Sequence, residues 1–250
     1  MAANAFYYQY KLGCTTKSSD RVPVGLRRRV RSGATLSELS AEMGVGIADS
    51  IITADARELV IDEVDQLRAQ QYDLLAVLLG RPPNGALLDA LKGLKGGDSV
   101  LGREVGILGE AAAATSEAAA EREYFALFVG VGRGELLPYA SYYLTGFLNE
   151  RPLARVREDL TALGIERDPS MTEPEDHIAI LFDVMGGLTS GRFTAGPDAA
   201  RDLFLRHIAP WGMRFFTDLE RARAARFYRS VGALGRAFLE IEAAAFAMDA

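Results

Sequence analysis

Apolar residues recur at helical spacing along almost the whole chain after Ala56. The first stripe has a period of about 3.6 residues and predicts a long helix that ends at Gly80, just before the breaker pair Pro82-Pro83. We expect this stripe to be buried, because a helix of a globular domain turns its apolar face toward the core. Its members are Val60, Val64, Leu67, Leu74 and Leu78.

Two more helices follow in the next 40 or so residues, which is an ordinary spacing for a helical domain. One contains four leucines and is closed by Gly96-Gly97, since glycine commonly follows a helix end. The other begins at Asp98 or Ser99 and runs through the alanine-rich stretch Glu110–Ala120, where helix propensity replaces a clear stripe. Further helices are predicted near residues 121–129, 138–148, 151–163, 174–190, 198–209, 211–224 and 226–248.

Strand signals are scarce. Tyr124–Val131 is aromatic and apolar, but the charged run Glu121–Glu123 before it favours a helix. The polar stretch Gly164–Thr172 interrupts the helical pattern and is predicted to be a hinge. The sequence therefore predicts an all-α fold, with one globular, bundle-like domain of about ten helices.

The charge distribution divides the chain in two. Before residue 38 a run of seven basic residues stands against the lone acid Asp20, although the whole chain has a net charge of −6. We predict a flexible, basic N-terminal extension over residues 1–55 and a helical domain over residues 56–250. The basic residues are Lys11, Lys17, Arg21, Arg27, Arg28, Arg29 and Arg31.

Two functional interpretations of this extension each lack part of the pattern that they require. Arg27-Arg28-Arg29 resembles the start of a twin-arginine export signal, but the polar residues 32–39 do not supply the apolar stretch that must follow. Thr35–Val45 has the pattern of one helix of a helix-turn-helix, but no second helix follows it.

General properties limit the function classes. A net charge of −6 argues against a nucleic-acid binder. The single cysteine, Cys14, cannot form an internal disulfide, so no oxidising compartment is required. No apolar run reaches the roughly 18–20 residues that span a bilayer, and the first residues lack a secretory signal. We expect a cytoplasmic protein without stable insertion into a membrane.

The stretch Gly130–Gly134 is glycine-rich and follows an apolar run. Its G-x-G-x-G spacing differs from the G-x-G-x-x-G of dinucleotide sites, and no βαβ pattern surrounds it. We predict a turn between two helices, whose backbone amides can accept an extended peptide.

The segment Glu173–His177 joins three acids, a proline and one of the two histidines. Pro174 suits the first position of a helix, and Thr172 or Glu173 can cap the amides ahead of it. Apolar residues from Ile178 onward supply the buried face. We therefore expect the charged cluster at the exposed tip of a helix, as a surface that holds a partner.

No residue set indicates catalysis or a metal site. Asp176 and His177 diverge by about 100° on a helix and form no ready dyad. Ser141 lacks the G-x-S-x-G context of a hydrolase. Cys14, His177 and His207 lie too far apart in sequence for metal ligands.

Three segments, in this order, resemble the TorD/DmsD (NarJ-like) family of cytoplasmic chaperones that mature molybdoenzymes. Glu123–Gly130 followed by Glu135–Tyr143 is similar to the family's "Y/F-x-x-L-F…P-Y-x-S-x-Y" segment. Glu173–His177 has the form E-P-x-D-H, and Phe204–Trp211 is similar to "F-x-x-H-x-x-x-W". The resemblance covers about residues 56–248, whereas residues 1–55 match nothing in the family.

The resemblance implies a non-enzymatic chaperone. Its partner would be the twin-arginine leader or the apo-form of a molybdopterin-dependent oxidoreductase of the DMSO/TMAO reductase or formate dehydrogenase type, held for cofactor insertion before export. An acidic body beside an apolar groove suits a leader that carries arginines and an apolar stretch. The expected contact residues are Tyr139, Ser141 and Tyr142 in the groove, and Glu173, Pro174, Asp176 and His177 in the polar segment.

No tightly bound cofactor is expected, and weak binding of guanine nucleotide or molybdopterin guanine dinucleotide is implied by the resemblance alone. The expected assembly is a monomer or a homodimer, and domain swapping is one route to the dimer. Two alternatives remain. A helical enzyme would use Glu173, Asp176 and His177 for acid–base chemistry, and a transcription regulator would use the basic extension. The first requires a further catalytic group or cofactor, and the second requires a complete recognition helix.

Overall fold

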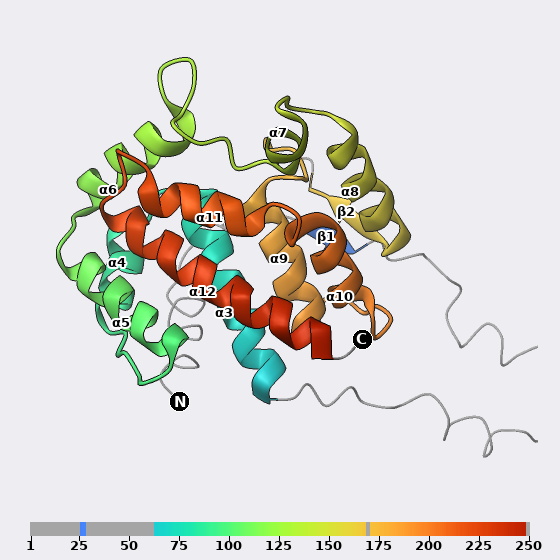
Figure 1. Ribbon diagram of the computed structural model, residues 1–250, viewed down its shortest axis with the longest axis horizontal. Helices are drawn as coiled ribbons and strands as arrows, with labels where there is room; N and C mark the ends of the chain where they lie inside the picture. The colour runs from blue at the N-terminus through green and yellow to red at the C-terminus, as the bar shows by residue number, and fades with distance from the viewer. Residues whose placement is uncertain (1–25, 29–62, 169–170, 249–250) are drawn as a thin grey trace, which may run out of the picture.

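The computed structural model describes residues 26–28, 63–168 and 171–248. At its centre, α3 (Glu63–Gly80) packs along α9 (Ile178–Thr189), and α12 (Phe227–Met248) packs along α11 (Gly212–Arg221). Helix α12 also contacts α3 and α5 (Val100–Ala113). In Figure 1, α4 and α5 lie at one end of this central group and α7, α8 and α10 lie at the other.

The all-α prediction is confirmed, and the only strands in the described residues are two of three residues each. Strand β1 (Leu26–Arg28) pairs antiparallel with β2 (Ile165–Arg167), with Arg27 opposite Glu166. The rest of the predicted N-terminal extension and the predicted helix start at Ala56 lie outside the described residues. The other helical segments are α4 (Gly85–Lys92), α6 (Glu117–Tyr124), α7 (Ala140–Thr145), α8 (Arg151–Ala162), α10 (Ala199–Leu203), and the π-helical turns η1 (Phe125–Val129) and η2 (Phe204–Ile208).

The boundaries of α4, α5 and α6 agree with the prediction at one position and differ from it at two. The side chain of Ser99 accepts the amide of Gly102 and starts α5 as predicted. The expected single helix to Ala120 is wrong, because Ser116 accepts the amide of Ala119 and starts a new helix, α6. Helix α4 ends at Lys92 rather than at the glycine pair beyond it.

The expected burial of the first stripe is wrong at its N-terminal end. Val64 and Leu67 are 59% and 48% exposed, whereas Leu75 and Leu78 are fully buried. The reason is length: α9, the helix that packs most closely along α3, has 12 residues against 18. At a rise of about 1.5 Å per residue it cannot cover α3 from end to end.

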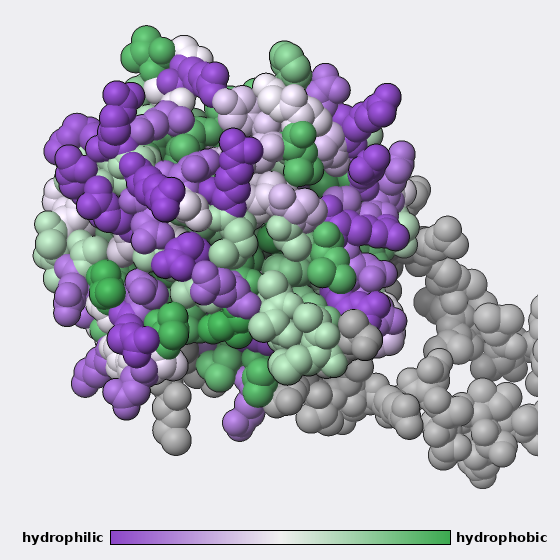
Figure 2. All heavy atoms as spheres, viewed as in Figure 1, coloured by the Kyte–Doolittle hydropathy of each residue, from purple (hydrophilic) through white to green (hydrophobic). Residues whose placement is uncertain are grey.

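Polar side chains cover most of the face in Figure 2, with apolar patches between them over α12 and its neighbours.

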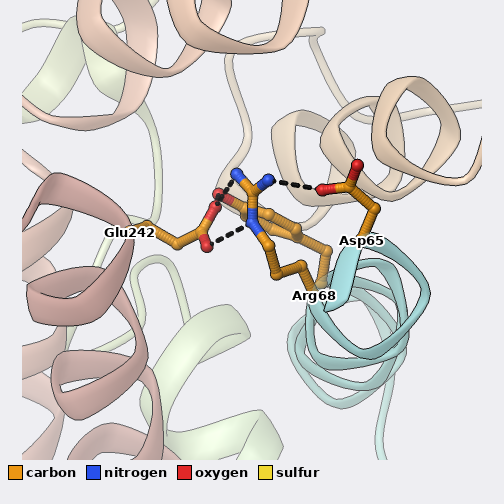
Figure 3. A network of polar contacts seen from close by, with 4 residues as sticks. Asp65, Arg68 and Glu242 are labelled. Carbon is orange, nitrogen blue, oxygen red and sulfur yellow. Dashed lines mark hydrogen bonds and ion pairs between the residues drawn. The ribbon is translucent and has the colours of Figure 1, made fainter. Parts of the chain in front are cut away.

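A buried polar network joins α3 to α12 (Figure 3). Arg68 donates two hydrogen bonds to Glu242, from Nε at 2.8 Å and from Nη2 at 2.9 Å, and a third to Asp65 at 2.7 Å. The hydroxyl of Tyr72 donates to Glu242 at 2.7 Å. Glu242 has no exposed surface, and these donors take the place of water around its carboxylate.

The glycine-rich stretch is a turn, as predicted, and it follows the π-helical turn η1. Gly130 has a φ of 64°, and a Cβ there would approach the carbonyl oxygen of Arg133 to 2.0 Å. A Cβ at Gly134 would approach the carbonyl carbon of Phe128 to 2.5 Å. The glycines are therefore required by the backbone path of the turn.

Throughout the described parts of the chain, no helix has both the length and the apolar character needed to cross a bilayer.

Candidate functional site

The acidic segment lies before α9 rather than inside it. Helix α9 begins at Ile178, and His177 is its N-cap: the ring Nδ1 accepts the amide of Ala179 at 3.1 Å. The predicted start at Pro174 is therefore wrong. The backbone of His177 is extended, and its amide closes a turn onto the carbonyl of Pro174 at 3.0 Å.

This segment pairs with the chain that enters α7. Tyr139 and His177 form an isolated antiparallel bridge. On either side of it, the amide of Ala140 donates to the carbonyl of Asp176 at 3.0 Å, and the amide of Ile178 donates to that of Pro138 at 2.9 Å. Two of the segments that carry the sequence resemblance therefore form one backbone unit.

Asp176 is buried and connects to α7 through Ser141. Its Oδ2 accepts the amide of Ser141 at 2.8 Å and the hydroxyl at 2.5 Å. Asp176 is 1% exposed and Ser141 has no exposed surface. Their expected positions, on an exposed tip and in a groove, are both wrong, because each supplies the hydrogen-bond partner that the other needs away from water.

His177 is also buried, at 4% exposure, and its ring meets the ring of Tyr139 edge to face at 5.0 Å between centroids. Burial lowers the pKa of His177 to about 3. The imidazole is therefore neutral at physiological pH, and its Nδ1 is occupied by the helix amide. This arrangement leaves neither His177 nor Asp176 in the position of an acid–base catalyst.

The three acids of the segment have different surroundings. Glu173 is exposed and accepts the hydroxyl of Tyr139 at 2.5 Å; burial of the phenol and this carboxylate raise the pKa of Tyr139. Glu175 is 7% exposed and pairs with Arg157 of α8 at 2.9 Å. Pro174 between them is half-buried. Of the four residues expected to make polar contacts, only Glu173 lies at the surface.

A groove of about 340 Å³ opens beside the other face of α7. Of the three residues expected in a groove, Tyr142 lines this one, while Tyr139 and Ser141 do not. The hydroxyl of Tyr143 donates to Asp218 at 3.2 Å, and burial together with Asp218 raises the pKa of Tyr143. The lining includes Leu136, Leu137, Tyr142, Tyr143, Arg214 and Asp218.

Charged and apolar side chains flank the groove residues in sequence. The guanidinium of Arg133 lies 5.0 Å from the ring centroid of Tyr142 and donates to its hydroxyl. Leu144 lies in α7 and is 44% exposed, and Phe147 follows the helix and is 70% exposed. Sequence reasoning missed Arg214 and Asp218, which come from α11 and follow no motif.

His207 and Trp211, from the third segment of the resemblance, make hydrogen bonds within the fold. Nε2 of His207 lies 2.7 Å from Asp159, and the indole of Trp211 donates to the carbonyl of His207 at 2.6 Å. Within residues 63–168 and 171–248, no three His, Cys, Asp or Glu side chains are grouped as metal ligands. The glycine turn is not followed directly by a helix, because α7 begins only at Ala140.

Comparison with known proteins shows what this chain is similar to. Residues 96–217 match the family model described as the nitrate reductase delta subunit, and this range contains both halves of the paired segment. The TorD chaperone of Vibrio cholerae serotype O1 is 32% identical over 123 residues, which cover 46% of this chain and 56% of the relative. The resemblance to the TorD/DmsD family is confirmed.

Other TorD chaperones match in the same way. That of Vibrio vulnificus is 33% identical over 135 residues, covering 53% of this chain and 58% of the relative. That of Aliivibrio fischeri is 32% identical over 125 residues. The matched part of this chain spans little more than half the length of these TorD relatives. These relatives are named chaperones, which agrees with the prediction of a non-enzymatic protein.

A solved structure described as a "putative redox enzyme maturation protein" from Archaeoglobus fulgidus superposes with a TM-score of 0.46 at 19% identity. The superposition covers 72% of this chain and 95% of that one.

Proposed function

We propose that this protein is a cytoplasmic maturation chaperone for a molybdopterin-dependent oxidoreductase. It binds the twin-arginine leader or the apo-form of the enzyme and holds it for cofactor insertion before export. The observation that carries this proposal is the match of residues 96–217 to the model of the nitrate reductase delta subunit, together with the similarity to relatives named TorD chaperones. That range contains the groove residues other than Asp218 and the segment that supports them. The chaperone acts as a monomer or a homodimer, for which domain swapping is one route.

The geometry supports a role for α7 as the element that presents the leader-binding surface. Its first turn is held from inside by Asp176, while Tyr142 on the same helix lines the groove. Asp218 supplies a carboxylate for an arginine, and exposed Phe147 supplies apolar surface for the stretch that follows the arginines.

The proposal requires no tightly bound cofactor. A guanine nucleotide or molybdopterin guanine dinucleotide would bind weakly, since the glycine turn offers it no phosphate cradle.

The test is binding of leader peptides from molybdoenzymes of the host to the full chain, measured by calorimetry. We expect affinity to fall when the leader arginines are replaced by glutamine and when salt is raised. Asp218→Asn should weaken binding severalfold. Asp89→Asn, which changes an exposed acid of α4 at the other end of the molecule, should not. No heat with any host leader would contradict the proposal.

A further inference from the structure

Strand β2 is a short edge beside the acidic segment. It follows α8 directly, through Gly164 with a φ of 68°. Ile165 is buried and anchors the strand, whereas Glu166 and Arg167 are exposed. In the described residues its sheet has one other member, β1. Both strands lie beside α8 and α9 in Figure 1, on the side of the molecule that carries α7.

The occupant of this edge comes from the basic N-terminal extension. Strand β1 is Leu26-Arg27-Arg28, and a third arginine, Arg29, follows in the sequence. A ribbon of two three-residue strands is at most marginally stable. The chain between β1 and β2 is long, so closing that loop also opposes the pairing. These two strands can therefore separate while the helical domain stays folded.

The surroundings of β2 suit an arginine-bearing peptide. A hollow of about 300 Å³ lies beside the strand, lined by Arg157, Leu160, Ile165, Glu166 and Glu175 among others. Nε and Nη2 of Arg157 both approach Oε2 of Glu175 at 2.9 Å. Among the described residues, Oε1 of Glu175 receives no hydrogen bond. A guanidinium that enters the hollow can bond to this oxygen, which lies in a largely buried carboxylate.

We propose that the edge of β2 is a strand-addition site for an extended, arginine-bearing peptide, and that the chain's own Leu26–Arg28 occupies it until a client segment takes its place. The inference rests on the proposed function, because the client segment is the leader. Backbone hydrogen bonds to β2 give the site its affinity, and Glu175 gives it a preference for arginine. The extension thus competes with the client and lowers its apparent affinity.

The experiment locks the pairing in the full chain. Arg27 and Glu166 are opposite each other, and opposite Cβ atoms in an antiparallel pair lie about 4.5–5.5 Å apart, close enough for a disulfide after a small adjustment. The variant is Arg27→Cys with Glu166→Cys in a Cys14→Ser background. Its control is Arg27→Cys with Arg103→Cys, which places the second thiol on α5 at the other end of the molecule.

We expect oxidised glutathione to cross-link the variant within one chain, shown by mass and mobility, and to leave the control uncross-linked. The oxidised variant should bind the leader peptide at least tenfold more weakly than the same protein after reduction. Failure to cross-link, or cross-linking of both pairs alike, would overturn the occupancy of β2 by the extension. Equal leader affinity in the two redox states would overturn the replacement of Leu26–Arg28 by the leader, and would leave the proposed function standing. Absence of binding in both states would overturn the proposed function and the exchange with it.

Discussion

Asp176 holds the amide nitrogen and the hydroxyl of Ser141 at 2.8 and 2.5 Å, and both residues are buried. This contact joins the segment before α9 to the first turn of α7, 35 residues earlier in the chain. Tyr142, the next residue of α7, lines the groove. Asp176 therefore supports the candidate binding surface from inside the protein.

Removal of this carboxylate should lower stability. Asp176→Ala leaves the amide and hydroxyl of Ser141 buried without an acceptor, so we expect the free energy of unfolding to fall by about 2–3 kcal/mol. Urea unfolding followed by circular dichroism measures it. Asp89→Ala, at an exposed acid, should change it by less than about 0.5 kcal/mol.

A double-mutant cycle separates the contact from other effects of that substitution. Asp176→Asn and Ser141→Ala should show a coupling energy of at least about 0.5 kcal/mol, since the two residues share a buried hydrogen-bond network. Additive effects would mean that the contact is absent in solution.

The buried histidine predicts a defined pH dependence. The pKa of His177 is about 3 in the folded protein, against 6.5 for an exposed histidine. Between these values the unfolded chain binds a proton that the folded protein does not, so His177 lowers the free energy of unfolding as pH falls from about 6.5 toward 3, by up to about 1.4 kcal/mol per pH unit. This destabilisation is absent above about pH 6.5.

His177→Asn provides the comparison, because asparagine keeps a side-chain acceptor for the N-terminus of α9 and does not titrate. From about pH 7 to about pH 5, the wild type should lose roughly 2 kcal/mol more than the variant. Urea unfolding at the two pH values tests this. Parallel losses in both proteins would show that the imidazole is accessible to protons.

Two phenylalanines should separate stability from binding. Phe182 is fully buried, with its ring 5.3 Å from that of Tyr72, so Phe182→Ala should lower the free energy of unfolding by about 3–5 kcal/mol. Phe147 is 70% exposed, and Phe147→Ala should leave stability within about 0.5 kcal/mol of the wild type while weakening leader binding. Thermal unfolding and calorimetry report on the two quantities. Unchanged leader affinity in Phe147→Ala would remove this ring from the binding surface.

The network of Arg68 and Glu242 should tolerate joint replacement better than loss of one partner. Glu242→Ala leaves the guanidinium of Arg68 and the hydroxyl of Tyr72 without their acceptor, and we expect a loss of about 3–5 kcal/mol. Arg68→Met combined with Glu242→Leu fills similar volume without charge and should lose less. Denaturant unfolding of the three proteins measures the difference. A double variant as unstable as Glu242→Ala would indicate that the ion pair itself stabilises the fold.

Much of the fold follows from local sequence. The end of α3 at Gly80 and the Ser99 cap of α5 are set by residues within a turn of the helix end, and amphipathic spacing indicates the class of fold. The resemblance to a chaperone family is also carried by short segments. The groove residues Arg214 and Asp218 could not be found in this way, because nothing near them in sequence marks α11 as the neighbour of α7.

The sequence by itself determined that this protein is helical, which residues begin most of its helices, and which family it resembles. It could not determine whether Asp176 and His177 face a partner or the core. The side chains of Asp176 and His177 can form hydrogen bonds both at an exposed surface and in the core. Their burial depends on Ser141 and Tyr139, which lie more than 30 residues away in the chain. Only the tertiary structure brings those donors and that ring to the segment, and burial then follows because the buried polar groups satisfy one another.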